Sequence, residues 1–181
     1  MKITILCVKP KTFKIGAYLI LKFTKSGYSH VAISMKDNWI GLRKVFDSVV
    51  PSTRMLEMNR FMSHYIIVKA YSINIADEDA KELEANAVKA LGTSYSFKGV
   101  WHQALKIAKI AKGKFKDGLS TLYCSEFVTW LVGKDISTGE NMNLDEFDKW
   151  ISERSRPVPP SVIESLNGVR HDEGILENDQ A

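Results

Sequence analysis

The chain lacks most features of secreted or membrane-spanning proteins. Cysteine is scarce: Cys7 and Cys124 are the only two in 181 residues, too few for a disulfide framework, and this usage fits a reducing compartment. The opening segment has a short apolar run without a small-residue cleavage site, so we expect no signal peptide. No stretch approaches the ~18 apolar residues of a membrane span. We therefore expect a protein that is cytoplasmic as made, with later release or injection left open.

The short motifs of metal and nucleotide sites are absent as well. The sequence has no CxxC or HxxxH spacing, no Walker-type phosphate loop and no GxGxxG. Without ligand spacing, two cysteines and four histidines give a zinc site a low rank, and we expect no cofactor and no metal. The formal net charge of +4 does not name a nucleic-acid partner, so none is expected.

The composition that is present supports one globular domain. Hydrophobic residues make up 45% of the chain, which is enough for a core that needs no disulfide or metal to stabilise it. From Glu164 onward the chain contains five acidic residues and one arginine, and apolar periodicity is nearly absent after residue 166. We predict a domain over residues 1–166 and an acidic, flexible tail over 167–181.

Apolar periodicity changes from that of strands to that of helices along the chain. Runs of β-forming residues predict strands over 3–8, 18–23, 29–35, 44–50 and 65–73. Helical spacing predicts helices over 77–91, 97–112, 121–132 and 145–153, with a last turn over 162–166. Strands first and helices later is an α+β order.

Cys124 is the candidate nucleophile. Its predicted helix places it in the first turn, where unpaired amides and the helix dipole favour an anion and lower the pKa of a thiol. A thiolate suits covalent catalysis, and the backbone N–H of the same residue could serve an oxyanion. The alternative, common for cysteine, is a small buried hydrophobic side chain.

Four histidines compete to be its base. His30 lies on a predicted strand, where a hydrogen-bonded structural histidine is the alternative. His102 is the main rival, because a histidine on a helix could also face Cys124. His64 borders a strand and His171 lies in the tail. The distance along the chain decides nothing, since such pairs are spatial neighbours.

Asp47 is the candidate for the third polar residue. It falls on the predicted strand after His30, where a carboxylate could hold an imidazole in one tautomer. The alternative is an ordinary acid at a sheet edge or turn. Asp37 and Glu57 are weaker rivals, because both are predicted in loops.

A lysine-rich segment is a candidate contact surface. Residues 98–116 contain six lysines and no acid. Lys106, Lys109 and Lys112 share one face of the predicted helix and could contact an anionic surface. A solvated helix face is the commoner explanation.

Several segments, taken in order, resemble the circularly permuted NlpC-type papain-like proteins. That group includes the YiiX-like proteins and relatives of lecithin retinol acyltransferase. The likeness covers about residues 14–166, and its most specific parts are Ser-His-Val-Ala-Ile and Cys-Ser-Glu. Ala17 departs from the group, which usually has an aspartate there. The similar segments are GAYLIL (Gly16–Leu21), YSHVAI (Tyr28–Ile33), LGTSYSF (Leu91–Phe97), LYCSEFV (Leu122–Val128) and PPSVI (Pro159–Ile163).

The resemblance implies a fold and four site residues. The fold is α+β and permuted papain-like, with a bent antiparallel sheet of about five strands packed against helices. Cys124 opens a helix and is the nucleophile, and His30 is the general base. Asp47 matches the third polar residue, which is often glutamate in the group. Tyr95 matches a tyrosine that helps to bind the oxyanion or substrate; the alternative is a packed aromatic.

The implied activity is that of a cysteine peptidase or amidase, which cleaves an amide or ester bond through a thioester. Two alternatives stay open. One is a lipid acyltransferase or thioesterase of the same fold, and the other is a catalytically inactive binding module with a basic helix. The expected substrate is thus a peptide, another amide or an acyl lipid, and the fold does not decide among them.

Overall fold

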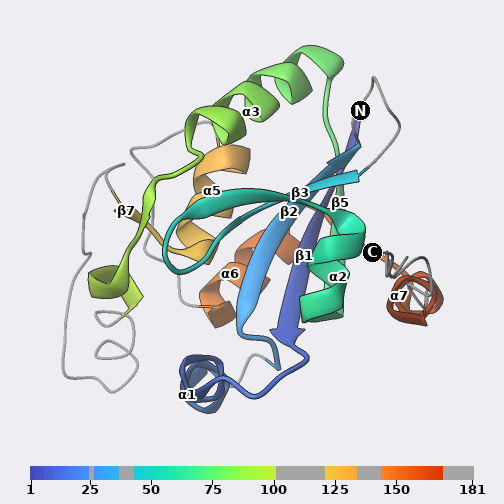
Figure 1. Cartoon of the computed structure of the whole chain (residues 1–181). Helices are drawn as coiled ribbons and strands as arrows, with labels where there is room; N and C mark the ends of the chain where they lie inside the picture. Colours follow the sequence, from blue (N-terminus) through green and yellow to red (C-terminus); the bar gives the residue numbers. More distant parts are fainter. Residues whose placement is uncertain (25–26, 37–42, 101–120, 134–143, 169–181) are drawn as a thin grey trace, which may run out of the picture.

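The computed structural model describes residues 1–24, 27–36, 43–100, 121–133 and 144–168 (Figure 1). In these residues the chain forms a six-stranded antiparallel sheet with helices on both faces. The strand order is β4-β3-β2-β1-β5-β8, with β1 (Lys2–Pro10), β2 (His30–Lys36), β3 (Arg43–Ser48), β4 (Thr53–Glu57), β5 (Tyr65–Asn74) and β8 (Arg156–Pro157). A separate parallel pair joins β6 (Ser94–Tyr95) and β7 (Thr121–Leu122).

The helices divide between the two faces of the sheet. The helices that lie wholly within the described residues are α1 (Ile15–Thr24), α2 (Met58–His64), α3 (Asp77–Lys89), α5 (Cys124–Gly133), α6 (Leu144–Ser152) and α7 (Pro160–Gly168). The larger core cluster joins one sheet face to α3, α5 and α6. The smaller cluster joins the other face to α2 and α7 (Figure 1). Alternation along each strand supplies both clusters, because successive side chains point to opposite faces.

The predicted α+β order is confirmed, with one error of element type. The predicted strand over 18–23 is wrong, because these residues belong to α1. Its run of apolar residues is too short for periodicity to separate a strand from a helix. In the sheet, β1 already pairs with β2 on one side and with β5 on the other, so no edge of β1 is left for another strand.

Other elements differ from prediction in their bounds. The predicted helix over 121–132 begins three residues later, after β7, so that Cys124 is its first residue. β4 and α2 fill a stretch for which no element was predicted. Residues 97–100 are helical, while the rest of the predicted 97–112 helix lies outside the described residues.

The C-terminal helices α6 and α7 are both joined to β5 by polar contacts. Asp148 of α6 accepts hydrogen bonds from Tyr71 (2.7 Å) and Lys69 (2.7 Å) of β5. The side-chain amide of Asn167 pairs with the backbone of Ile67 at 3.0 and 2.9 Å. α7 extends to Gly168. Residues 167 and 168 are thus part of a helix, whereas the sequence placed them in the tail. Residues 169–181 of that predicted tail lie outside the described residues.

Candidate active site

The segment before Cys124 is held by contacts from two other strands. The backbone carbonyl of Leu122 accepts a hydrogen bond from the Ser48 hydroxyl (2.7 Å) and another from the Ser96 N–H (3.1 Å). Cys124 then opens α5, and α5 packs across β2 and β3. These contacts place a helix N-terminus, with N–H groups that have no acceptor within the helix, beside the sheet.

Gly99 allows this segment to pack closely. A Cβ at position 99 would lie 2.8 Å from the Ser96 hydroxyl and 2.8 Å from the Tyr123 ring. Real Cβ atoms do not approach other atoms so closely, so any larger residue would push the ring aside. Because Tyr123 precedes Cys124, the absence of a side chain at Gly99 helps to position the thiol.

His30 and Asp47 meet on one face of the sheet. Asp47 of β3 pairs directly with Ala32 of β2, and His30 lies two residues before Ala32, so the two side chains share a face as diagonal neighbours. Nε2 of His30 lies 3.0 Å from Oδ2 of Asp47. Both residues are buried, and no part of Asp47 is exposed. The contact is therefore a buried hydrogen bond rather than a surface ion pair.

Cys124 is the third member of this group of side chains. It lies close enough to the His30 ring to affect the pKa of the imidazole, and it is buried, with 6% of its surface exposed. Because Asp47 engages Nε2 of the ring, Nδ1 is the nitrogen left for the sulfur. The structure thus brings together the predicted nucleophile, base and carboxylate. Along the chain, Cys124 is 94 residues from His30 and 77 residues from Asp47.

Arg54 is a fourth member of this network that the sequence did not reveal. Asp47 pairs with Arg54 across β3 and β4, and both carboxylate oxygens are engaged: Nε lies 2.9 Å from Oδ1 and Nη2 lies 3.2 Å from Oδ2. Such a fork-to-carboxylate pair fixes the carboxylate in its plane. Asp47 and Arg54 are seven residues apart on either side of Pro51, a spacing that suits two residues paired across a hairpin. This signal could be used only if β4 was recognised as a strand.

Tyr65 covers the other side of the imidazole. Its ring stacks on His30, with centroids 5.4 Å apart and planes 26° apart. Burial and the nearby Asp47 raise the pKa of its phenol, while the nearby Arg54 lowers it. Tyr65 therefore lies near both the base and the arginine that holds the carboxylate. No pattern in the sequence distinguishes this tyrosine from the other β-forming residues of its strand.

Tyr95 also lies at the site. It is paired with Leu122 in the β6–β7 ladder, two residues before Cys124. Burial raises the pKa of its phenol, and the neighbouring Cys124 and Tyr65 raise it further. Tyr95 thus stays a neutral O–H group, which is the form that can donate to an oxyanion. Its ring also packs edge-on against Phe97, as the alternative of a packed aromatic requires.

The rival residues are not brought to the thiol by any described contact. Glu57 is the N-cap residue of α2 and is exposed, and His64 ends the same helix and is exposed. Asp37, His102 and His171 lie outside the described residues, as do Lys106, Lys109 and Lys112 of the predicted basic face.

The electrostatics of the network favour a charged imidazole. Burial lowers the pKa of His30, but the hydrogen bond to Asp47 and the neighbouring Cys124 outweigh this effect and raise the pKa to about 9. Burial raises the pKa of Asp47, yet the hydrogen bonds from His30 and Arg54 leave it below its usual value. Near neutral pH the site therefore holds a carboxylate and an imidazolium.

We expect this pKa shift to appear in the pH dependence of stability. A group whose pKa is higher in the folded state stabilises fully below its unfolded value, here about 6.5, and loses that contribution as the pH rises through about 9. The advantage of wild type over His30→Gln in unfolding free energy should fall by about 3 kcal/mol across this window. Urea unfolding at several pH values measures it. His64→Gln, at an exposed site, should show no such fall, and a flat profile for His30→Gln would contradict the assignment.

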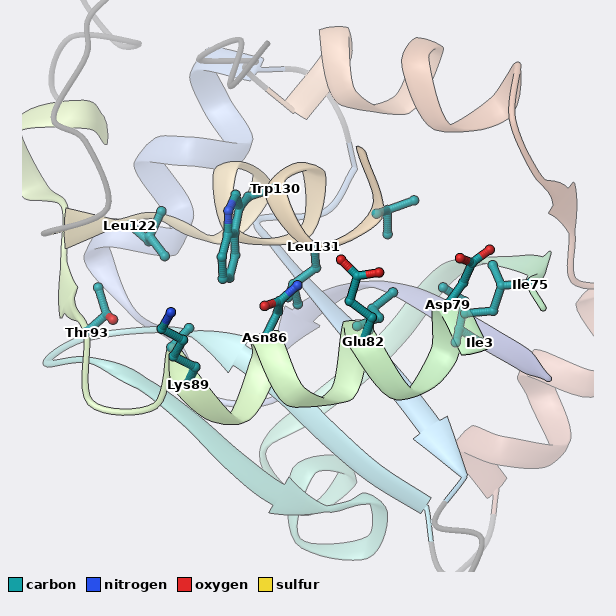
Figure 2. Close-up of a pocket in the computed structure, with 13 residues that line it drawn as sticks. Ile3, Ile75, Asp79, Glu82, Asn86, Lys89, Thr93, Leu122, Trp130 and Leu131 are labelled. Carbon is teal, nitrogen blue, oxygen red and sulfur yellow. The ribbon is translucent and has the colours of Figure 1, made fainter. Parts of the chain in front are cut away.

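A groove lies between α3 and α5. It has a volume of about 680 Å³. Figure 2 shows Glu82 and Asn86 of α3 turned toward Trp130 and Leu131 of α5. Cys124, His30, Asp47 and Tyr95 are not among its lining residues. Its wall includes Thr93 and Leu122, which are two residues along the chain from Tyr95 and Cys124.

Comparison with known proteins identifies a fold neighbour. No protein-family model matches the chain, and no curated protein matches it. Among solved structures, the fold is similar to that of the metalloprotein YiiX from Escherichia coli O157:H7, with a TM-score of 0.53 and 16% sequence identity over 89% of each chain. At this identity the similarity shows the fold alone.

The described residues offer no counterpart to the metal site of that metalloprotein. Within the described ranges, no three His, Cys, Asp or Glu side chains gather where they could hold a metal ion. The carboxylate beside His30 is already engaged by Arg54 through both oxygens. The described residues therefore do not fit a metal centre.

Within the same ranges, no helix has the length and apolar character needed to cross a bilayer.

Proposed function

We propose that the protein is a cysteine hydrolase of the permuted papain-like kind, with Cys124 as nucleophile and His30 as general base. The observation that carries the proposal is the buried His30–Asp47 hydrogen bond beside Cys124, the first residue of α5. A thiol at a helix start, an imidazole on a strand and a carboxylate behind the imidazole are the three parts of an activated nucleophile. Fold similarity to YiiX is compatible with it but does not carry it.

The reaction would run in two halves. In the reactive form the thiol proton is already on His30, and the Cys124 sulfur attacks the carbonyl carbon of an amide or ester. The oxyanion is held by the backbone N–H of Cys124 and by the Tyr95 hydroxyl. His30 returns the proton to the departing amine or alcohol, which leaves a thioester on the enzyme. It then takes a proton from water, which attacks the thioester, releases the acid and restores the thiol.

The arrangement behind the base would keep it in position. Asp47 accepts from Nε2, so the ring presents Nδ1 to the sulfur. Arg54 holds the carboxylate and Tyr65 stacks on the ring, so the imidazole has little freedom to rotate. Fixing the reacting groups in this way lowers the entropy lost on reaching the transition state.

An acyl lipid is the second candidate substrate. The lining of the groove between α3 and α5 includes the apolar residues Ile3, Leu83, Leu122 and Leu131 together with the polar residues Asp79, Glu82, Asn86 and Lys89. A hydrocarbon chain would lie against the apolar part of this lining. On this view the same thioester would be resolved by water or by the alcohol or amine of an acceptor lipid.

The proposal predicts the pH at which Cys124 reacts. In wild type, we expect iodoacetamide to alkylate Cys124 readily near neutral pH. His30→Ala should move the midpoint of the alkylation profile to higher pH and slow the reaction at neutral pH by about tenfold or more, because the imidazole no longer favours the thiolate. Mass spectrometry of the Cys124 peptide, taken over a pH series, gives the rate.

Two histidine variants serve as controls for this experiment. His64→Ala removes an exposed imidazole at the end of α2 and should leave the profile unchanged. His102→Ala tests the rival base. The proposed dyad is wrong if His102→Ala shifts the profile and His30→Ala does not. It is equally wrong if native Cys124 reacts no faster than Cys7 does in the denatured chain.

A further inference from the structure

The connection between β1 and β2 carries large apolar side chains on the surface of the protein. Phe13 is 78% exposed, Ile15 69% and Tyr18 50%. The rings of Phe13 and Tyr18 contact each other, with centroids 5.9 Å apart. Three such residues gathered over six positions form a patch, whereas single exposed apolar residues are common and need no explanation.

The pattern within α1 turns part of this patch outward. Ile15, Tyr18 and Lys22 are spaced i, i+3 and i+7, so they share one helical stripe, and all three are exposed. On the opposite side Ile20 packs against the larger core cluster. The helix is thus attached to the domain by one side and presents an apolar, lysine-tipped stripe on the other.

The charge along this segment of the chain has a single sign. The first 36 residues contain seven lysines and no acidic residue. Lys9, Lys11, Lys14 and Lys22 are exposed. We call the exposed surface made by Lys11, Phe13, Lys14, Ile15, Tyr18 and Lys22 the α1 face.

We propose that the α1 face binds the surface of an anionic lipid bilayer. The two aromatic side chains and Ile15 would enter the boundary between headgroups and acyl chains, and the lysines would lie among the lipid phosphates. A nucleic acid would pair with the lysines but leave the apolar side chains in water. A second copy of this chain would cover the apolar side chains but bring like charges together. An anionic bilayer satisfies both features.

The position of α1 gives this binding a consequence. α1 leaves the end of β1 and leads into the start of β2, where His30 pairs with Val8 (Figure 1). A bilayer on the α1 face would therefore lie at the end of the sheet that carries the Cys124–His30 contact. The proposal does not rest on hydrolase activity, since it concerns only attachment to the surface.

Vesicle co-sedimentation of the full-length protein tests it. We expect binding to vesicles of phosphatidylcholine with phosphatidylglycerol, little binding to phosphatidylcholine alone, and weaker binding at higher salt. Phe13→Ser with Tyr18→Ser, and separately Lys11→Glu with Lys14→Glu, should each weaken binding by about tenfold or more. The matched control, Val88→Ser with Lys81→Glu on the exposed side of α3, should bind as wild type does.

The alternatives give different results. Failure of wild type to bind anionic vesicles overturns the proposal, as does unchanged binding by both α1 variants. It is also overturned if changing Lys106, Lys109 and Lys112 to Glu abolishes binding while the α1 variants retain it. If Phe13→Ser with Tyr18→Ser instead converts a dimer to a monomer without affecting lipid binding, the face is an interface between copies. An unchanged midpoint of thermal unfolding shows that each variant is folded. An unchanged rate of Cys124 alkylation shows that the variant leaves the proposed hydrolase site intact, so failure of the lipid proposal can be told from failure of the hydrolase proposal.

Discussion

Replacing Cys124 by alanine is expected to remove hydrolysis, with a decrease of at least about 10³-fold in kcat, because the atom that forms the thioester is lost. Cys7→Ala should keep most of the activity. Cys7 is fully buried in the core, and burial together with the nearby Asp148 raises the pKa of its thiol, so it stays protonated. The two cysteines therefore give a matched pair of variants in one chain.

The measurement needs a substrate panel, because the acyl group is not defined. Nitrophenyl esters of short and long acyl chains, together with peptide amides, cover the two candidate substrate classes. Mass spectrometry should find an acyl group on the Cys124 peptide of wild type and none on the Cys7 peptide. A marked preference for long chains would favour the acyl-lipid candidate. Hydrolysis that survives in Cys124→Ala would sink the proposed mechanism.

Replacing Asp47 by alanine is expected to produce the largest loss of stability. Asp47 is wholly buried and is the hydrogen-bond partner of both His30 and Arg54. Its removal leaves the imidazole and a guanidinium without their shared carboxylate, and breaking a buried pair in this way costs about 3–5 kcal/mol. Urea unfolding at neutral pH measures the loss. Activity should fall as well, since the ring is no longer held with Nδ1 toward the sulfur.

Two further variants separate positioning from stability. Asp47→Asn preserves the shape of the side chain and should lose less stability than Asp47→Ala, yet still lower activity by about 10²-fold or more through the wrong tautomer. In Asp47→Ala with Arg54→Met, no unpaired guanidinium remains, so the double variant should be more stable than Asp47→Ala alone. If the two changes are simply additive, the Asp47–Arg54 contact is not energetically coupled. Wild-type activity in Asp47→Asn would exclude Asp47 from the site.

The parts of the site differ in how far the sequence could predict them. Cys124, His30 and Asp47 could be chosen because their residue types and order match a recognisable pattern. Arg54 and Tyr65 could not be chosen, since an arginine and a tyrosine on strands carry no local signal of a role. Arg54 becomes significant only through its pairing with Asp47, which depends on where the hairpin at Pro51 turns.

Some elements of the fold follow from the local sequence pattern, and others depend on tertiary structure. Alternation in β2 and helical spacing in α3 are properties of the residues themselves, and the α+β order follows from them. α1 shows the limit, because its apolar run suits a strand equally well and only the two occupied edges of β1 excluded that choice. The sequence by itself determined which residues could react and in what order they occur. The tertiary structure alone decided that they meet, because a contact between a helix start and two strands depends on register and packing across the whole sheet rather than on any local preference.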